Sequence, residues 1–190
     1  HFIAVTRTQI NEISENKEAP TFKNTIEALD GTGLQLDRIT SIFFNLNSAE
    51  TNDEIQKIAQ EISPALSDFK NDLLLNEKLF KKVKHVYENR TSLSLNKEQA
   101  MLLKKNYIGF TRNGANLSYK DKDKLREIDG KLSKLKLQFG ENVLAETNKF
   151  YLQITNEKEL SGLPDGVIEM AAQTAKEKKM TGWVFTLDYP

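Results

Sequence analysis

Apolar residues recur every three or four positions through residues 1–149, and only two prolines, Pro20 and Pro64, interrupt that range. This spacing is typical of amphipathic helices, which bury one apolar stripe against a neighbour. It predicts helices at about 3–14, 22–46, 51–73, 76–90, 96–113 and 119–147. Because such helices are not stable alone, the chain is expected to pack them side by side into a bundle.

The second of these segments carries the most regular pattern. Its apolar residues fall on one stripe, made by Phe22, Ile26, Leu29, Leu36, Ile39, Phe43 and Leu46. Thr21 is the expected N-cap, because its hydroxyl can accept a first-turn N–H. Gly31 and Gly33 interrupt the stripe, and each weakens a helix interior by roughly 1 kcal/mol. We therefore expect a bend there, or a close approach by a neighbouring element.

The third helix has a predicted start and a predicted defect. Thr51 and Glu54 match a capping box, in which each side chain pairs with the other's backbone N–H. Pro64 lies within the following apolar run, where it removes a backbone donor and clashes with the preceding turn. A kink is expected near residues 60–63.

Beyond residue 149 the period changes from helical to alternating. Residues 150–154 and 183–187 read as two short strands, and Pro164 begins a helix that runs to about residue 178. The predicted fold class is mainly α: an antiparallel bundle of about six helices over 1–149, then a small α+β piece over 150–190. Two strands alone are marginal. We therefore expect the second piece to be the truncated start of a larger domain, with an uncovered apolar surface at Trp183, Phe185 and Leu187.

The charge and cysteine counts exclude several function classes. The chain has 27 Lys and Arg, 27 Asp and Glu, and no cysteine. Zero net charge provides no overall attraction to nucleic acid or to anionic membranes, and no apolar run reaches the ~18 residues of a membrane span. Without cysteine there is no disulfide, no thiolate zinc site and no thiol catalysis. Both cytoplasm and periplasm remain open as compartments.

The sequence offers no candidate catalytic, cofactor-binding or metal-binding residue. A hydrolytic zinc site commonly uses two His four apart on a helix with a Glu between them. Only His1 and His85 are present, and neither lies in such a motif. No Gly-x-Ser-x-Gly elbow is present, and Gly31-Thr32-Gly33 lacks the Lys-Ser/Thr of a phosphate loop. His85 is interpreted as an ordinary surface or half-buried side chain.

The predicted fourth helix is locally basic. Its surroundings contain more cations than anions, namely Lys70, Lys78, Lys81, Lys82, Lys84 and Arg90 against Asp72, Glu77 and Glu88. One alternative for the whole chain is therefore a free-standing helical interaction module that binds an anionic partner through this helix. A solvated helical face explains the same residues. A stand-alone enzyme that uses carboxylates alone is a weaker alternative.

Several stretches together resemble the N-terminal region of the thimet oligopeptidase and peptidyl-dipeptidase family of zinc metallopeptidases. They are residues 19–29, 42–49, 51–55, 112–117, 139–148, 161–164 and 183–188. Phe43-Phe44-Asn45-Leu46 with Thr51-Asn52-Asp53-Glu54 is more similar to the bacterial peptidyl-dipeptidase branch. Lys23 departs from the pattern, since an acidic residue is expected there. The similar stretches span nearly all 190 residues.

The resemblance implies a division of labour within a longer enzyme. The family's His-Glu-x-x-His helix, its additional Glu ligand and its Tyr and His residues lie in a C-terminal part that has no matching position here. The chain is thus expected to be an N-terminal piece that forms a wall of the substrate channel, binds no zinc itself and is inactive alone. The parent is expected to be a bacterial, zinc-dependent peptidyl-dipeptidase that hydrolyses short peptides. Its expected partners are the missing catalytic region and those peptides, not nucleic acid or membrane.

Overall fold

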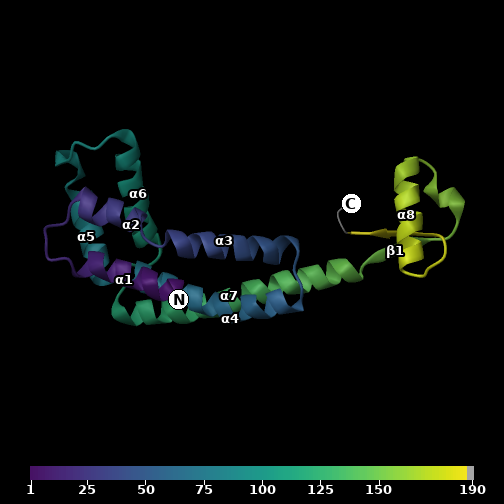
Figure 1. Ribbon diagram of the computed structural model, residues 1–190, viewed down its shortest axis with the longest axis horizontal. Coiled ribbons are helices and arrows are strands. Elements are labelled where there is room, and N and C mark those ends of the chain that lie inside the picture. Colours follow the sequence, from purple (N-terminus) through teal and green to yellow (C-terminus); the bar gives the residue numbers. More distant parts are fainter. Residues whose placement is uncertain (188–190) are drawn as a thin grey trace. The chain divides into compact units, whose positions relative to one another are not determined.

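The computed structural model describes residues 1–187 and divides into two compact units, residues 1–135 and 136–190. The fold is mainly α, as the apolar spacing predicts (Figure 1). The first unit contains α1 (Phe2–Glu15), the π-helical turn η1 (Phe22–Glu27), α2 (Ala28–Asp30), α3 (Leu34–Ala49), α4 (Asp53–Leu74), α5 (Glu77–Glu88), the 3₁₀ turn η2 (Arg90–Ser92) and α6 (Lys97–Arg112). Helix α7 (Tyr119–Lys149) contributes residues to both units. The predicted domain boundary at 149/150 stays a prediction.

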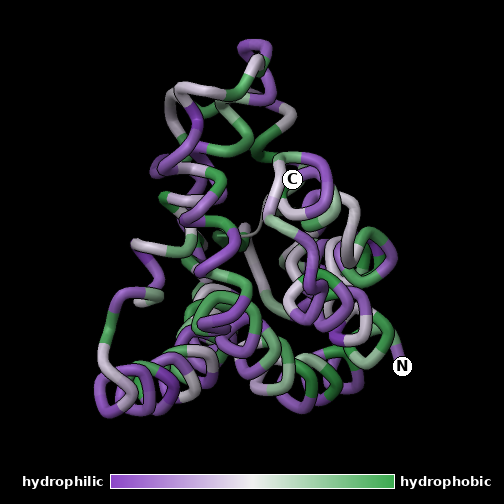
Figure 2. Tube along the Cα trace, turned by 90° about the vertical axis from the view of Figure 1, so that its left-hand side faces the viewer, coloured by the Kyte–Doolittle hydropathy of each residue, from purple (hydrophilic) through white to green (hydrophobic). Residues whose placement is uncertain are grey.

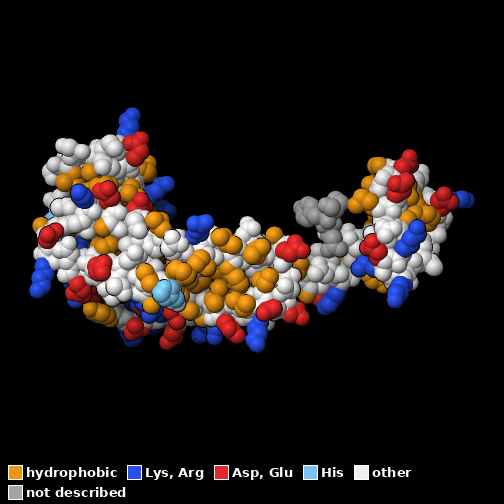
Figure 3. Space-filling model, viewed as in Figure 1, with side chains coloured by type: hydrophobic (Ala, Val, Ile, Leu, Met, Phe, Trp, Pro, Cys, Tyr) orange, Lys and Arg blue, Asp and Glu red, His pale blue; other side chains and the backbone are white. Residues whose placement is uncertain are grey.

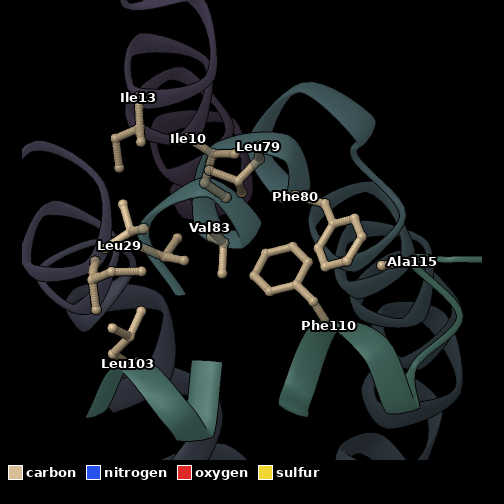
Figure 4. Close-up of a cluster of buried hydrophobic side chains, with 11 residues drawn as sticks. Ile10, Ile13, Leu29, Leu79, Phe80, Val83, Leu103, Phe110 and Ala115 are labelled. Carbon is tan, nitrogen blue, oxygen red and sulfur yellow. The ribbon is translucent and has the colours of Figure 1, made fainter. Parts of the chain in front are cut away.

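The hydrophobic core of the first unit lies among α1, η1, α2, α5 and α6. Figure 4 shows Phe80 and Phe110, from α5 and α6, with their rings against one another beside Val83. Leu79, Val83 and Ile26 are completely buried. Helix α5 supplies four buried apolar residues at helical spacing, which places it at the centre of this core.

The predicted start of the second segment is confirmed. Thr21 accepts the Asn24 N–H at 3.1 Å, and Asn24 accepts the Thr21 N–H in return. The expected irregularity at the glycines is a full break, since α2 ends at Asp30 and α3 begins at Leu34. Gly33 has φ +74°, and a Cβ there would lie 3.1 Å from the Thr6 methyl group. The close approach of α1 therefore accounts for the glycine.

Beyond Leu36 the apolar stripe is not covered, which corrects the sequence interpretation. Leu29 and Leu36 are buried, whereas Ile39 and Leu46 are about half exposed. The reason is that α3 leaves the core and runs beside α4 (Figure 1). Periodicity identifies a helical face but does not say whether a neighbour covers it.

Helix α4 begins one residue later than its capping pattern predicts. Asn52, not Thr51, is the N-cap, because its side-chain oxygen accepts the Ile55 N–H at 2.9 Å. The Thr51 hydroxyl instead donates to Asn47 Oδ1. The helix continues through Pro64. The kink expected near residues 60–63 stays a prediction. The predicted ends of α5, α6 and α7 agree with the structure to within two residues.

The second unit contains the end of α7, β1 (Tyr151–Ile154), the 3₁₀ turn η3 (Glu157–Leu160), α8 (Asp165–Glu177) and β2 (Trp183–Thr186). The two predicted strands are present and pair antiparallel, with Leu152 opposite Phe185 and Ile154 opposite Trp183. Gly182 enters β2 with φ +79°. The small residues Ala171 and Ala175 of α8 are both buried. Figure 2 shows that hydrophobic and hydrophilic residues alternate along the helical turns of the chain.

Candidate functional site

The two histidines lie on different elements and are both exposed. His1 precedes α1, where its ring contacts Phe2, and His85 is on the outer face of α5. Among residues 1–187, no group of three His, Asp or Glu side chains is arranged to hold a metal ion. The side chains that the structure describes therefore do not fit a zinc site.

The cations of α5 are largely used within the chain. Lys78 Nζ lies 2.6 Å from Glu15 Oε1, and Lys82 Nζ donates to the Asn16 carbonyl at 2.5 Å. Lys84 pairs with Glu88 one turn later, and Arg90 stacks over the Tyr87 ring at 4.3 Å. The contacts of Lys78 and Lys82 join α5 to the end of α1, so these two cations help to hold the two helices together.

A polar junction that the sequence does not reveal joins three helices of the first unit. Asp72 on α4 accepts from Arg7 Nη2 at 2.6 Å and from Arg126 Nη1 at 2.8 Å. Arg7 is on α1, 65 residues before Asp72, and Arg126 is on α7, 54 residues after it. A shallow hollow of about 260 Å³ opens beside this junction, lined in part by Arg7, Asp72 and Asn76. No short motif could have indicated such a pairing.

A second polar cluster lies where α7 begins. Glu77 accepts from the Tyr119 hydroxyl at 2.8 Å and from Lys122 Nζ at 3.3 Å. The Tyr119 hydrogen bond, with help from Lys122, lowers the pKa of Glu77, and Glu77 in turn raises the pKa of Tyr119. Lys122 is only 5% exposed, and its ammonium also reaches the Leu75 carbonyl at 3.4 Å. The cluster fixes the start of α7 against the end of α4 and the start of α5.

The first unit also has a hollow of about 400 Å³ at the break between α2 and α3. Apolar side chains form its floor and Asp30, Asp37 and Lys105 line it as charged groups. The Gly33 N–H at its edge is satisfied by Gln9 Oε1 at 3.2 Å. The hollow has room for an apolar side chain.

Uncovered apolar side chains are the most prominent surface feature of the first unit. Figure 3 shows hydrophobic side chains gathered along the stretch where α3 and α4 run. The exposed members on α3, α4 and α7 are Ile39, Ile42, Leu46, Ile58, Ile128 and Leu132. Ile128 and Leu132 of α7 are therefore not packed within a bundle. Patches of this kind mark surfaces that meet other polypeptides or ligands.

The second unit has an apolar surface of its own, made by the end of α7 and the sheet. A hollow of about 510 Å³ is lined by Phe139 and Val143 of α7 together with Phe150 and Leu187. Leu187 is 56% exposed, and Trp183 and Phe185 are half-buried. The expectation that these residues leave an uncovered apolar surface is confirmed.

No helix within residues 1–187 combines the length and the apolar character that crossing a bilayer requires. No protein-family model matches the chain.

Similar proteins with curated names are peptidases. The chain is 35% identical to the dipeptidyl carboxypeptidase of Escherichia coli (strain K12) over 182 residues, which are 95% of this chain and 27% of the relative. It is 27% identical to oligopeptidase A of the same organism, over all of this chain and 29% of the relative. A thimet-like oligopeptidase of Dictyostelium discoideum is 28% identical over 92% of this chain and 26% of the relative.

The chain is thus homologous to the dipeptidyl carboxypeptidases and oligopeptidases A, as its sequence motifs indicate. The higher identity to the dipeptidyl carboxypeptidase agrees with the branch that residues 43–54 favour. The chain spans about a quarter of the length of these relatives.

Proposed function

We propose that this homologue of the dipeptidyl carboxypeptidases and oligopeptidases A is one part of a zinc-dependent peptidyl-dipeptidase and forms a wall of its substrate channel. The observation that carries the proposal is the 35% identity over 95% of the chain to a dipeptidyl carboxypeptidase. Similarity that extends from α1 to β2 supports a shared fold, and a shared fold supports a shared place in the enzyme.

In this proposal the chemistry belongs to polypeptide outside this chain. The side chains described here do not fit a zinc site, and the sequence has no His-Glu-x-x-His motif. The zinc ion would be held by the remaining part of the parent, where it would activate water for hydrolysis of the peptide bond. What this chain supplies is shape: helices held together by the core around α5 and by the junction at Asp72.

The substrates in this proposal are short unfolded peptides, from which C-terminal dipeptides are released. Uncovered apolar residues on α3, α4 and α7 support a role in lining a channel, because such residues can contact peptide side chains without selecting one sequence. The proposed source is bacterial, as the dipeptidyl carboxypeptidase relatives are, and the proposed compartment is cytoplasm or periplasm.

The test is hydrolysis by the longer gene product that contains this segment. It should release dipeptides from the C-terminus of peptides of about eight residues, lose activity with a chelator and regain it with zinc. The 190-residue chain with added zinc should show no turnover. Products from internal cleavage alone would assign the oligopeptidase mode instead, and turnover by the 190-residue chain would overturn the proposal.

A further inference from the structure

The second unit presents a continuous apolar platform, which we define as Phe139, Val143, Phe150, Leu152, Phe185 and Leu187. The strand register places Leu152 directly opposite Phe185, so both side chains lie on the same face of the sheet. Leu187 alternates with Phe185 along the chain and lines the hollow that Phe139, Val143 and Phe150 also line. The α7 members and the sheet members therefore form one surface.

The opposite face of the sheet is already covered. Val184 alternates with Trp183 and Phe185, and it is the strand residue with the least exposure, 1%. Its burial goes with that of Ala171 and Ala175, the small residues of α8. Helix α8 thus packs against the Val184 face, and no element of the second unit covers the platform within residues 136–187.

The platform consists of large apolar side chains that the second unit leaves largely exposed to solvent. Phe139 is 71% exposed and Leu152 is 52% exposed. A two-stranded sheet needs additional packing to be stable. Its outer strand edges also have no partner strand among the described residues.

The charges around the platform indicate the chemistry of its partner. Glu146 lines the same hollow, and its carboxylate lies 2.9 Å from Lys149 Nζ, which is one turn away on α7. No Lys or Arg lines this hollow among the described residues, so the lining offers no cation that would attract an anionic membrane or a nucleic acid. An apolar protein surface fits it best.

We propose that the platform is the docking surface for the part of the parent polypeptide that lies outside this chain. This inference rests on the proposed function. The relative with 35% identity has about three quarters of its length outside the matched segment, which is ample polypeptide to cover the platform. Coverage within one polypeptide needs no second copy, and it would fix the sheet unit against the catalytic region.

The test uses thiol labelling, because the chain contains no cysteine of its own. Leu152→Cys and Phe139→Cys probe the platform, and Lys176→Cys on the exposed face of α8 is the control. Each is placed both in the 190-residue chain and in the longer gene product. Labelling by a maleimide is followed by mass spectrometry of the peptide that carries the introduced cysteine, with circular dichroism as a check on folding.

Both platform cysteines should react at least about tenfold more slowly in the longer polypeptide than in the 190-residue chain, while the control reacts equally in both. Equal labelling in a longer polypeptide that hydrolyses peptides would overturn the docking proposal and leave the proposed function intact. Protection of the platform cysteines in a longer polypeptide without peptidase activity would support the docking proposal and overturn the proposed function. Protection that grows with the concentration of the 190-residue chain would assign the platform to a second copy and overturn the proposal.

Discussion

Arg126 of α7 donates to the carboxylate of Asp72 on α4 at 2.8 Å, and the same carboxylate accepts from Arg7 of α1. One acidic side chain therefore pairs with two guanidinium groups from distant parts of the chain. All three side chains are partly exposed, so the junction serves more to fix the positions of α1, α4 and α7 than to provide stability.

Asp72→Asn should lower the free energy of unfolding by about 0.5–1 kcal/mol, because it removes both ion pairs and leaves two cations facing each other. Urea unfolding at low salt measures the effect. Glu146→Gln is the control, since it removes a pair within a single helix and should change stability by less. High salt should reduce the Asp72→Asn effect, and an effect independent of salt would contradict the electrostatic explanation.

Tyr119→Phe should raise the pKa of Glu77 toward its ordinary value of 4.5, because the Tyr119 hydroxyl is the largest cause of the lowered pKa. With a lowered folded-state pKa, Glu77 contributes stability above pH 4.5 and loses it as the pH falls through the folded value. The variant should therefore show a weaker loss of stability on acidification. Titration of Glu77 by NMR checks the shift, and an unchanged pKa would contradict the assignment.

Gly182→Ala should destabilise the sheet unit strongly. The backbone at Gly182 has φ +79°, and a Cβ there would lie 2.2 Å from the Ile154 carbonyl oxygen, so the β1–β2 pairing would have to shift. Gly166→Ala in the first turn of α8 is the matched control, because its Cβ would meet nothing within 4 Å. That control should be neutral or stabilising by up to about 1 kcal/mol. Amide exchange in β1 measures both.

Leu79→Ala should lower the free energy of unfolding by about 2–5 kcal/mol, since the side chain is completely buried between α5 and its neighbours. Leu34→Ala, at a side chain that is 64% exposed, should change it by less than about 0.5 kcal/mol. Chemical denaturation followed by circular dichroism gives both values. Similar losses in the two variants would contradict the position of the core.

Local signals in the sequence account for most of the elements. The hydroxyl of Thr21 marks a helix start that the structure confirms. The predicted bounds 76–90 and 96–113 agree with α5 and α6 to within two residues. The capping-box pattern predicts the N-cap of α4 one residue early, because Thr51 and Asn52 both carry a capping oxygen and only the three-dimensional turn decides between them.

What the sequence could not predict depends on contacts between distant residues. Examples are the exposed stripe at Ile39 and Leu46 and the ion pairs of Asp72. Both depend on how the helices are arranged in space, which the spacing of apolar residues does not predict. The candidate surfaces were only partly foreseen. The uncovered residues near Trp183 were expected, whereas the role of Phe139 and Val143 in the same platform required the structure.

The apolar stripe that the break at Gly31–Gly33 interrupts has one buried part and one exposed part. Leu29 before the break and Leu36 just after it are buried, whereas Ile39 and Leu46 on α3 are about half exposed. We therefore expect the later part of α3 to open locally at a lower free energy than α5. A surface that opens locally while the core stays folded can adjust to bound side chains of different size. Helix α3 would then respond to what it touches while α5 stays fixed.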